Sequence, residues 1–131
     1  MHWGMVIDLK LCIGCNTCVV VCKMRNGTPK GIFWNRVLEE EVGKYPTARR
    51  VFWPVRCMQC EDPACVEACP TGASYQREDN LVLIDGDKCV GCRACILACP
   101  YDVRSMLDGK GAYFKEGPTP FEERVYQNHV A

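Results

Sequence analysis

The sequence predicts a small α+β fold in which short strands, short helices and long loops surround clustered cysteines. Twelve of the 131 residues are cysteine, and they fall into three closely spaced groups. A segment that contains the first group recurs around the third, which indicates a repeated unit. Glycines and prolines punctuate residues 23–56 and the tail from residue 102 onward, so loops are expected there. At this length one compact domain is the limit.

The repeated unit predicts a short strand, a ligand-bearing loop and a short helix in each copy. A shift of 77 positions, the separation of Cys12 and Cys89, places residues 5–8 over residues 82–85 and aligns all four cysteines of the two groups. We expect each apolar run to form the strand and the aspartate after it to end the strand. Gly14 and its counterpart in the third group stand where a positive φ or a close backbone approach favours glycine.

The spacing of the cysteines is the most specific feature of the sequence. The groups read Cys12-x2-Cys15-x2-Cys18-x3-Cys22, Cys57-x2-Cys60-x4-Cys65-x3-Cys69 before Pro70, and Cys89-x2-Cys92-x2-Cys95-x3-Cys99 before Pro100. The third group matches in full the bacterial ferredoxin run, in which three thiolates hold one [4Fe–4S] cluster and the fourth holds its neighbour. We expect this fourth cysteine to lie at the start of a helix. The spacing therefore predicts [4Fe–4S] clusters with all-cysteine ligation.

The second and third groups complement each other as the two halves of a two-cluster site. One predicted cluster is held by Cys57, Cys60, Cys65 and Cys99, and the other by Cys89, Cys92, Cys95 and Cys69. The first group copies the third, but the chain holds no further counterpart of the second group. The incomplete ligands are therefore Cys12, Cys15 and Cys18, together with Cys22, which points toward an absent cluster. We expect this chain to supply two complete [4Fe–4S] clusters.

Zinc ligation and disulfides are the alternatives for so many cysteines. Soft thiolates bind zinc as well as iron–sulfur clusters, although zinc sites usually combine two separated cysteine pairs. A disulfide framework is typical of exported proteins, and residues 1–10 lack the basic stretch and apolar run of a secretory signal. The two histidines, His2 and His129, lie at the ends of the chain, which argues against a Rieske centre.

Composition and charge exclude several classes of function. Lys and Arg together number 16, as do Asp and Glu, so the formal net charge is zero and no basic block marks a nucleic-acid surface. No apolar run approaches the roughly 18 residues that span a bilayer. The sequence also lacks a phosphate-binding loop, a dinucleotide fingerprint and a nucleophile motif. We therefore expect no catalytic site, and one-electron transfer as the chemistry of the cysteines.

The segments around the cysteine groups predict one strand and contain several basic residues that could change the redox potentials of the clusters. A strand is expected at residues 50–53, and nearby aromatic side chains are expected to serve as core or interface residues. Five basic residues close to the ligands are candidates to raise cluster potentials, although solvated surface positions explain them equally well. They are Lys23, Arg25, Arg56, Arg93 and Arg104.

The three motifs place the sequence near a known family. The runs that carry the likeness are residues 4–8, the three motifs, Cys69-Pro70-Thr71-Gly72-Ala73, Cys99-Pro100-Tyr101, and residues 118–123 and 126–129. They resemble the iron–sulfur subunits of the dimethyl sulfoxide reductase and polysulfide reductase family of molybdopterin oxidoreductases. The resemblance implies an electron-transfer subunit that relays single electrons between a membrane quinone-linked subunit and a molybdopterin catalytic subunit.

The resemblance also implies a particular division of the chain. Members of that family have four cysteine motifs and four [4Fe–4S] clusters, so this chain is expected to be truncated before the fourth motif. We expect a single ferredoxin-like domain of the bacterial dicluster type over residues 1–131. Its parts would be the first motif half in residues 1–49, a two-cluster core in residues 50–103, and a linker toward the absent motif in residues 104–131.

Partners and location follow from the resemblance as expectations. The expected partners are a molybdopterin catalytic subunit and a membrane anchor subunit, with no nucleic acid and no membrane span in the chain itself. A location in the cytoplasm, or in the periplasm by co-export with a partner, is expected, peripheral to the membrane through the complex. Two alternatives fit the same motifs, namely a free-standing two-cluster soluble electron carrier and a zinc-stabilised structural module.

Overall fold

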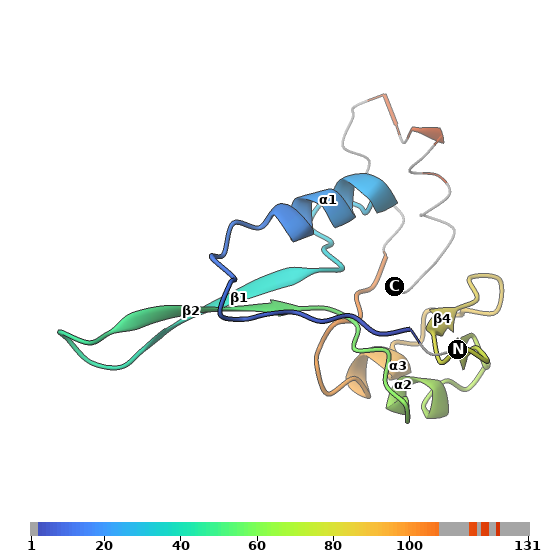
Figure 1. The fold of residues 1–131 in the computed structure, drawn as a ribbon. Helices are drawn as coiled ribbons and strands as arrows, with labels where there is room; N and C mark the ends of the chain where they lie inside the picture. The colour runs from blue at the N-terminus through green and yellow to red at the C-terminus, as the bar shows by residue number, and fades with distance from the viewer. Residues whose placement is uncertain (1–2, 108–115, 118, 121–122, 124–131) are drawn as a thin grey trace.

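The computed structural model describes residues 3–107, 116–117, 119–120 and 123 (Figure 1). Its helices and strands follow one another as α1 (Thr17–Asn26), β1 (Arg36–Val42), β2 (Arg49–Val55), α2 (Ala64–Glu67), β3 (Ser74–Gln76), β4 (Val82–Ile84) and α3 (Ala94–Leu97). Long loops join these short elements, as the sequence predicts. None of the helices in the described part of the chain is long and apolar enough to cross a membrane. Most of the linker expected at 104–131 lies outside the described residues.

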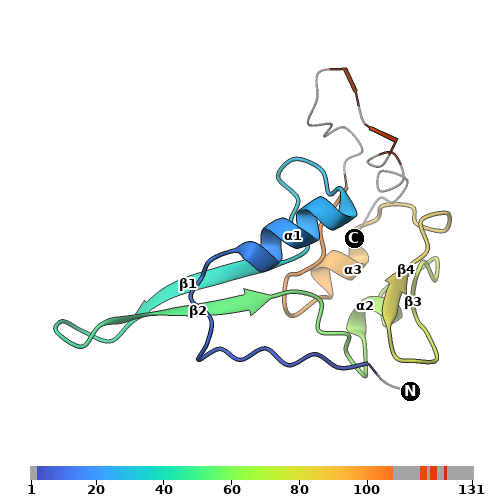
Figure 2. The same cartoon turned by 45° about the horizontal axis from the view of Figure 1, so that its top comes forward.

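Strands β1 and β2 form an antiparallel hairpin that extends away from the other elements (Figures 1 and 2). Glu39 faces Phe52 in its register. Of the residues in these two strands only Val55, at the base of the hairpin, is buried. Arg36, also at the base, donates to the backbone carbonyl of Asp102 and pairs with its carboxylate at 3.5 Å. These contacts fasten the hairpin to the segment that follows the third motif.

Strands β3 and β4 form a second antiparallel hairpin, and helices α2 and α3 lie beside each other close to it (Figure 2). The N–H of Asp85 donates to the carbonyl oxygen of Ala73 at 2.8 Å, one step beyond the paired strands. The hydrophobic core of the described residues comprises Val55, Ala73, Val82, Cys95 and Leu107. The core is therefore small, and two of its members, Ala73 and Cys95, lie within or just after a cysteine motif.

Helices α2 and α3 repeat one backbone pattern at a separation of 30 positions, which is that of Cys65 and Cys95. In both copies the N–H of the fourth cysteine donates to the carbonyl three residues earlier, at 3.1 Å for Cys69 and 3.2 Å for Cys99. The sequence Ala-Cys-x-x-Ala-Cys-Pro underlies both copies. The longer repeat of 77 positions relates the first motif to the third, and this shorter one relates the second motif to the third.

The first copy of the longer repeat differs from the expectation at its start. Residues 5–8 form no strand and Val6 is 94% exposed, whereas the matching residues 82–84 form β4 as predicted. β4 has β3 as its partner, but no strand of the described residues pairs with residues 5–8. A strand needs such a partner for its backbone donors and acceptors. The strand expected at residues 50–53 is confirmed within the longer β2.

The prediction that the fourth cysteine lies at the start of a helix is wrong. In the second and third motifs this cysteine follows the end of α2 or α3, and Cys22 lies inside α1. The proline that comes next in those two motifs disfavours helical backbone at the residue before it, so both helices end early. No proline follows Cys22, and α1 therefore continues until Gly27, which ends it at a φ of 58°.

Candidate iron–sulfur sites

Each motif curls its chain with a left-handed residue directly before the second cysteine. The φ values are 70° at Gly14, 50° at Gln59 and 69° at Gly91, which confirms the positive φ predicted for the two glycines. Glycine adopts this backbone without steric cost, whereas Gln59 adopts it despite its side chain. That side chain fastens the second motif to β4, because its Oε1 accepts the N–H of Val82 at 2.5 Å.

Four cysteines from the second and third motifs line a single small cavity that is partly open to solvent. We call it the cysteine cavity, and its thiols belong to Cys57, Cys60, Cys65 and Cys99. Val82 and Arg104 complete much of its wall. The structure thus brings together around one space the four residues that the sequence assigns to one cluster.

The electrostatics of the cysteine cavity centre on Cys65. Burial raises the pKa of its thiol, and the guanidinium of Arg104 acts in the opposite direction. The neighbouring thiols of Cys57 and Cys99 raise the pKa further, because a second negative charge close by is unfavourable. Three thiolates at such close quarters need positive charge between them, which bound iron would supply.

The arrangement fits a polynuclear cluster. In the part of the chain that the structure describes, no group of three Cys, His, Asp or Glu side chains is placed to hold one metal ion. Four cysteines that line one shared cavity match the four thiolate ligands of a cubane, in which each of four irons takes one thiolate. The residues present therefore fit a [4Fe–4S] cluster.

Two of the ligands predicted for the other cluster come from the segments of α2 and α3. Cys95 is buried in the first turn of α3, and Cys69 follows α2. The Cys69 sulfur accepts the N–H of Ser74 at 3.4 Å and contacts the hydroxyl of Thr71 at 3.6 Å. These hydrogen bonds, that of Ser74 above all, lower the pKa of the Cys69 thiol to about 7. Its grouping with Cys89, Cys92 and Cys95 stays a prediction.

Side chains outside the motifs hold the loops in place, and sequence reasoning missed them. The amide of Gln76 on β3 donates to the backbone carbonyls of Cys60 at 3.1 Å and Glu61 at 3.3 Å. Ser74 on the same strand serves both sites, since its N–H reaches Cys69 and its hydroxyl accepts from Arg104 at 2.7 Å. The sequence feature that could have indicated these roles is position, because Ser74 and Gln76 lie on the short strand that follows the second motif.

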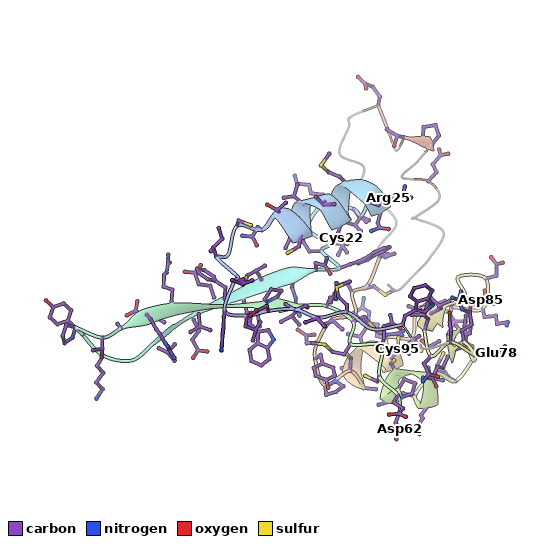
Figure 3. All side chains as sticks on the ribbon, viewed as in Figure 1. Cys22, Arg25, Asp62, Glu78, Asp85 and Cys95 are labelled. Carbon is purple, nitrogen blue, oxygen red and sulfur yellow. The ribbon has the colours of Figure 1, made fainter. Side chains whose placement is uncertain are left out.

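The first motif lies apart from the other two. Figure 3 shows Cys22 on α1, well separated from Cys95 on α3. Cys15 and Cys18 are exposed, and the other two thiols of the motif are half-buried. A hydrogen bond of 3.3 Å with the Thr17 hydroxyl lowers the pKa of the Cys15 thiol. These thiols keep the cluster-binding spacing without a second motif beside them in the described residues.

The five basic residues near the motifs fall into distinct environments. Arg104 is only 8% exposed and lines the cysteine cavity, whereas Arg25 and Arg93 are exposed. The ammonium of Lys23 donates to the carbonyls of Pro29 and Ile32 at 2.8 Å each and binds the 28–32 loop. Arg56 contacts the sulfur of Met5. Of these five basic residues, Arg104 is thus the one that lines the cysteine cavity.

Sequence comparisons identify the family. The family described as "4Fe-4S dicluster domain" matches residues 48–115, and a second family of the same description matches residues 11–73. The chain is 51% identical to the B subunit of the selenate reductase of Mesobacillus selenatarsenatis, over 81% of this chain and 36% of that relative. It is 46% identical to the B subunit of the sulfite dehydrogenase of Allochromatium vinosum, over 79% and 50% respectively.

A third relative extends the same picture. The chain is 36% identical to the B component of the anaerobic dimethyl sulfoxide reductase of Escherichia coli, over 84% of this chain and 58% of that relative. The chain thus spans between 36% and 58% of the length of these curated relatives. Its cofactors are [4Fe–4S] clusters, as the motifs predict. This protein belongs to the 4Fe-4S dicluster family, and its homologues are the iron–sulfur B subunits of the dimethyl sulfoxide, selenate and tetrathionate reductases.

Proposed function

We propose that the chain carries single electrons through [4Fe–4S] clusters as the iron–sulfur subunit of a multi-subunit oxidoreductase. In this proposal the electrons pass between a quinone-linked subunit that anchors the complex to the membrane and a molybdopterin catalytic subunit. The names of the relatives support a multi-subunit setting, since each is the B component of a reductase or dehydrogenase. The observation that carries the proposal is the cysteine cavity, in which four thiols surround one space.

Two complete clusters are proposed for this chain, on the predicted ligands. One set is Cys57, Cys60, Cys65 and Cys99, and the other is Cys89, Cys92, Cys95 and Cys69. The backbone pattern shared by α2 and α3 supports a ferredoxin-like fold of the bacterial dicluster type with its core in residues 50–103. The β1–β2 hairpin joins this core to residues 1–49, because β1 lies before the division and β2 runs across it.

The residues of the chain have separate tasks in this function. When bound, a [4Fe–4S] cluster accepts one electron and releases it again. Four protein thiolates on each cluster leave no open position for a substrate, which is consistent with the absence of a catalytic motif from the sequence. The N–H of Ser74 stabilises negative charge on the sulfur of Cys69. Val82 gives the cysteine cavity part of its apolar wall.

Anaerobic spectroscopy of the purified holo chain tests this function. Dithionite should produce the electron paramagnetic resonance signals of reduced [4Fe–4S] clusters, and a one-electron acceptor should restore the oxidised spectrum without loss of iron. An affinity-tagged chain expressed in its native host should also retain a large molybdenum-containing subunit. Zinc without acid-labile sulfide would refute the proposal in favour of a structural module. Reversible clusters without any molybdenum-containing partner would instead favour a free-standing carrier.

A further inference from the structure

Arg104 is a buried cation at the wall of the cysteine cavity. It lies beyond the last cysteine of the third motif, and its side chain returns to line the cavity beside Cys65 and Cys99. A charged side chain is seldom so buried without a partner, and here the partner is neutral: its Nη1 donates to the Ser74 hydroxyl at 2.7 Å. The described salt bridges include no carboxylate bound to Arg104, so its positive charge is not neutralised by an ion pair there.

We propose that Arg104 sets the potential of the cysteine-cavity cluster, raising it relative to its value without this charge, and that Ser74 is the residue that positions it. The inference rests on the proposed function, because it assumes a cluster at Cys57, Cys60, Cys65 and Cys99. Reduction adds one negative charge to a site that already carries four thiolates. A buried guanidinium stabilises that added charge more strongly than an exposed cation does, since water screens it less.

The Ser74 hydroxyl gives the charge a fixed place. Ser74 is 3% exposed and lies on β3, where it pairs with Ile84 of β4. Its backbone N–H bonds the sulfur of Cys69, a predicted ligand of the other cluster. One residue therefore contacts a ligand of one site through its backbone and the cation of the other site through its side chain. We expect a change in the hydroxyl to affect the cysteine-cavity cluster alone, because the N–H is retained.

A redox titration of the holo chain, followed by electron paramagnetic resonance, tests the proposal. The signal of the cysteine-cavity cluster is first assigned as the one altered in Cys65→Ser. Arg104→Gln should increase the ratio of oxidised to reduced cluster about tenfold at a fixed potential, which is a fall of about 59 mV for a one-electron couple. Arg104→Lys should keep most of the wild-type potential. Arg93→Gln is the matched control, because Arg93 is exposed, and should shift either potential far less.

Ser74→Ala is a second variant that tests the proposal even if Arg104→Gln does not bind its cluster. This variant retains Arg104 and removes the hydroxyl that accepts its hydrogen bond. The potential of the cysteine-cavity cluster should fall by less than in Arg104→Gln, and that of the other cluster should stay unchanged. If Arg104→Gln binds its clusters and their potentials are unshifted, the inference is wrong. If Arg104→Gln does not bind its clusters, unshifted potentials in Ser74→Ala overturn it. Both outcomes leave the proposed function intact. A wild-type chain without clusters would refute the proposed function itself.

Discussion

The ring of Phe52 occupies the space into which a Cβ atom on Gly14 would project. Phe52 lies on β2, and Gly14 lies in the loop of the first motif at a φ of 70°. The glycine thus meets two requirements, because the backbone is left-handed and the aromatic ring lies against it. This contact seats the first cysteine loop on the β1–β2 hairpin. It also gives Phe52 the packing role that the sequence predicts.

Substitution at three glycines separates these two requirements. Gly72→Ala introduces only backbone strain, since φ is 64° and no atom lies within 4 Å of the new Cβ. It should lower the free energy of unfolding by about 1 kcal/mol. Gly14→Ala adds the clash with Phe52 and should cost about 1–3 kcal/mol more. Gly4→Ala meets neither obstacle and serves as the control. If thermal denaturation shows the same loss of stability in Gly14→Ala and Gly72→Ala, the Phe52 ring moves aside without cost.

Lys23 should govern the stability of the loop that follows α1. Its ammonium donates to Thr28, Pro29 and Ile32, and it lies 4.5 Å from the centre of the Phe33 ring. Because hydrogen bonds from a charged donor contribute about 1.5–3 kcal/mol, Lys23→Met should speed amide exchange at Ile32 by about tenfold or more.

The control for Lys23 is a neighbouring surface cation. Arg25→Met removes a positive charge from the same helix at an exposed position and should leave the exchange at Ile32 nearly unchanged. Equal acceleration in both variants would mean that charge on α1, not the contacts of the ammonium, orders the loop.

Cys69 should be reactive at neutral pH before cluster insertion. Its pKa of about 7 is below the ordinary value of 9.0 because Ser74 and Thr71 donate hydrogen bonds to the sulfur, so the thiolate forms as pH rises through 7. Alkylation mapped by mass spectrometry on the metal-free chain should reach half its maximal rate near pH 7 at Cys69. Burial raises the pKa of Cys65, which should react only at higher pH.

Thr71→Val provides the internal check on Cys69. The variant removes the hydroxyl 3.6 Å from the sulfur and should move the alkylation midpoint upward, while the bond from Ser74 keeps it below 9.0. A wild-type midpoint at 9.0 would contradict the hydrogen-bonded geometry of this loop.

Cys99 should behave as a ligand of the second motif's cluster and not of its own. The cysteine cavity places it with Cys57, Cys60 and Cys65. Cys99→Ser and Cys65→Ser should therefore alter the same electron paramagnetic resonance signal, and Cys95→Ser should alter the other. If Cys99→Ser and Cys95→Ser each remove the same signal, the two motifs do not exchange ligands in this way.

Spacing rules could predict which cysteines lie together in the second and third motifs, because iron–sulfur sites constrain the chain within a few residues. The spacing groups Cys57, Cys60, Cys65 and Cys99 together, and in the structure these four residues line one cavity. Strand β4 and the positive φ of Gly14 followed from the same local pattern.

Features that depend on distant contacts were not predictable in this way. β1 requires β2 as a partner, and residues 5–8 form no strand because none pairs with them in the described part of the chain. Arg104 was one of five equivalent candidates in the sequence, and only its burial against Ser74 distinguishes it. Sequence spacing carries no information on which basic side chain folds inward.

Iron and acid-labile sulfide per chain, measured on the anaerobically purified protein, show how many [4Fe–4S] clusters the chain holds. We predict about eight irons and eight sulfides for each chain, because two complete [4Fe–4S] sites are proposed for it. One site is the cysteine cavity, and the other is formed by Cys89, Cys92, Cys95 and Cys69. Cys65→Ser and Cys95→Ser should each reduce or alter one cluster, and Cys22→Ser should leave both counts unchanged. A reproducible content of about twelve irons would show that the first motif holds a cluster of its own. Zinc in place of iron, without sulfide, would contradict the account as a whole.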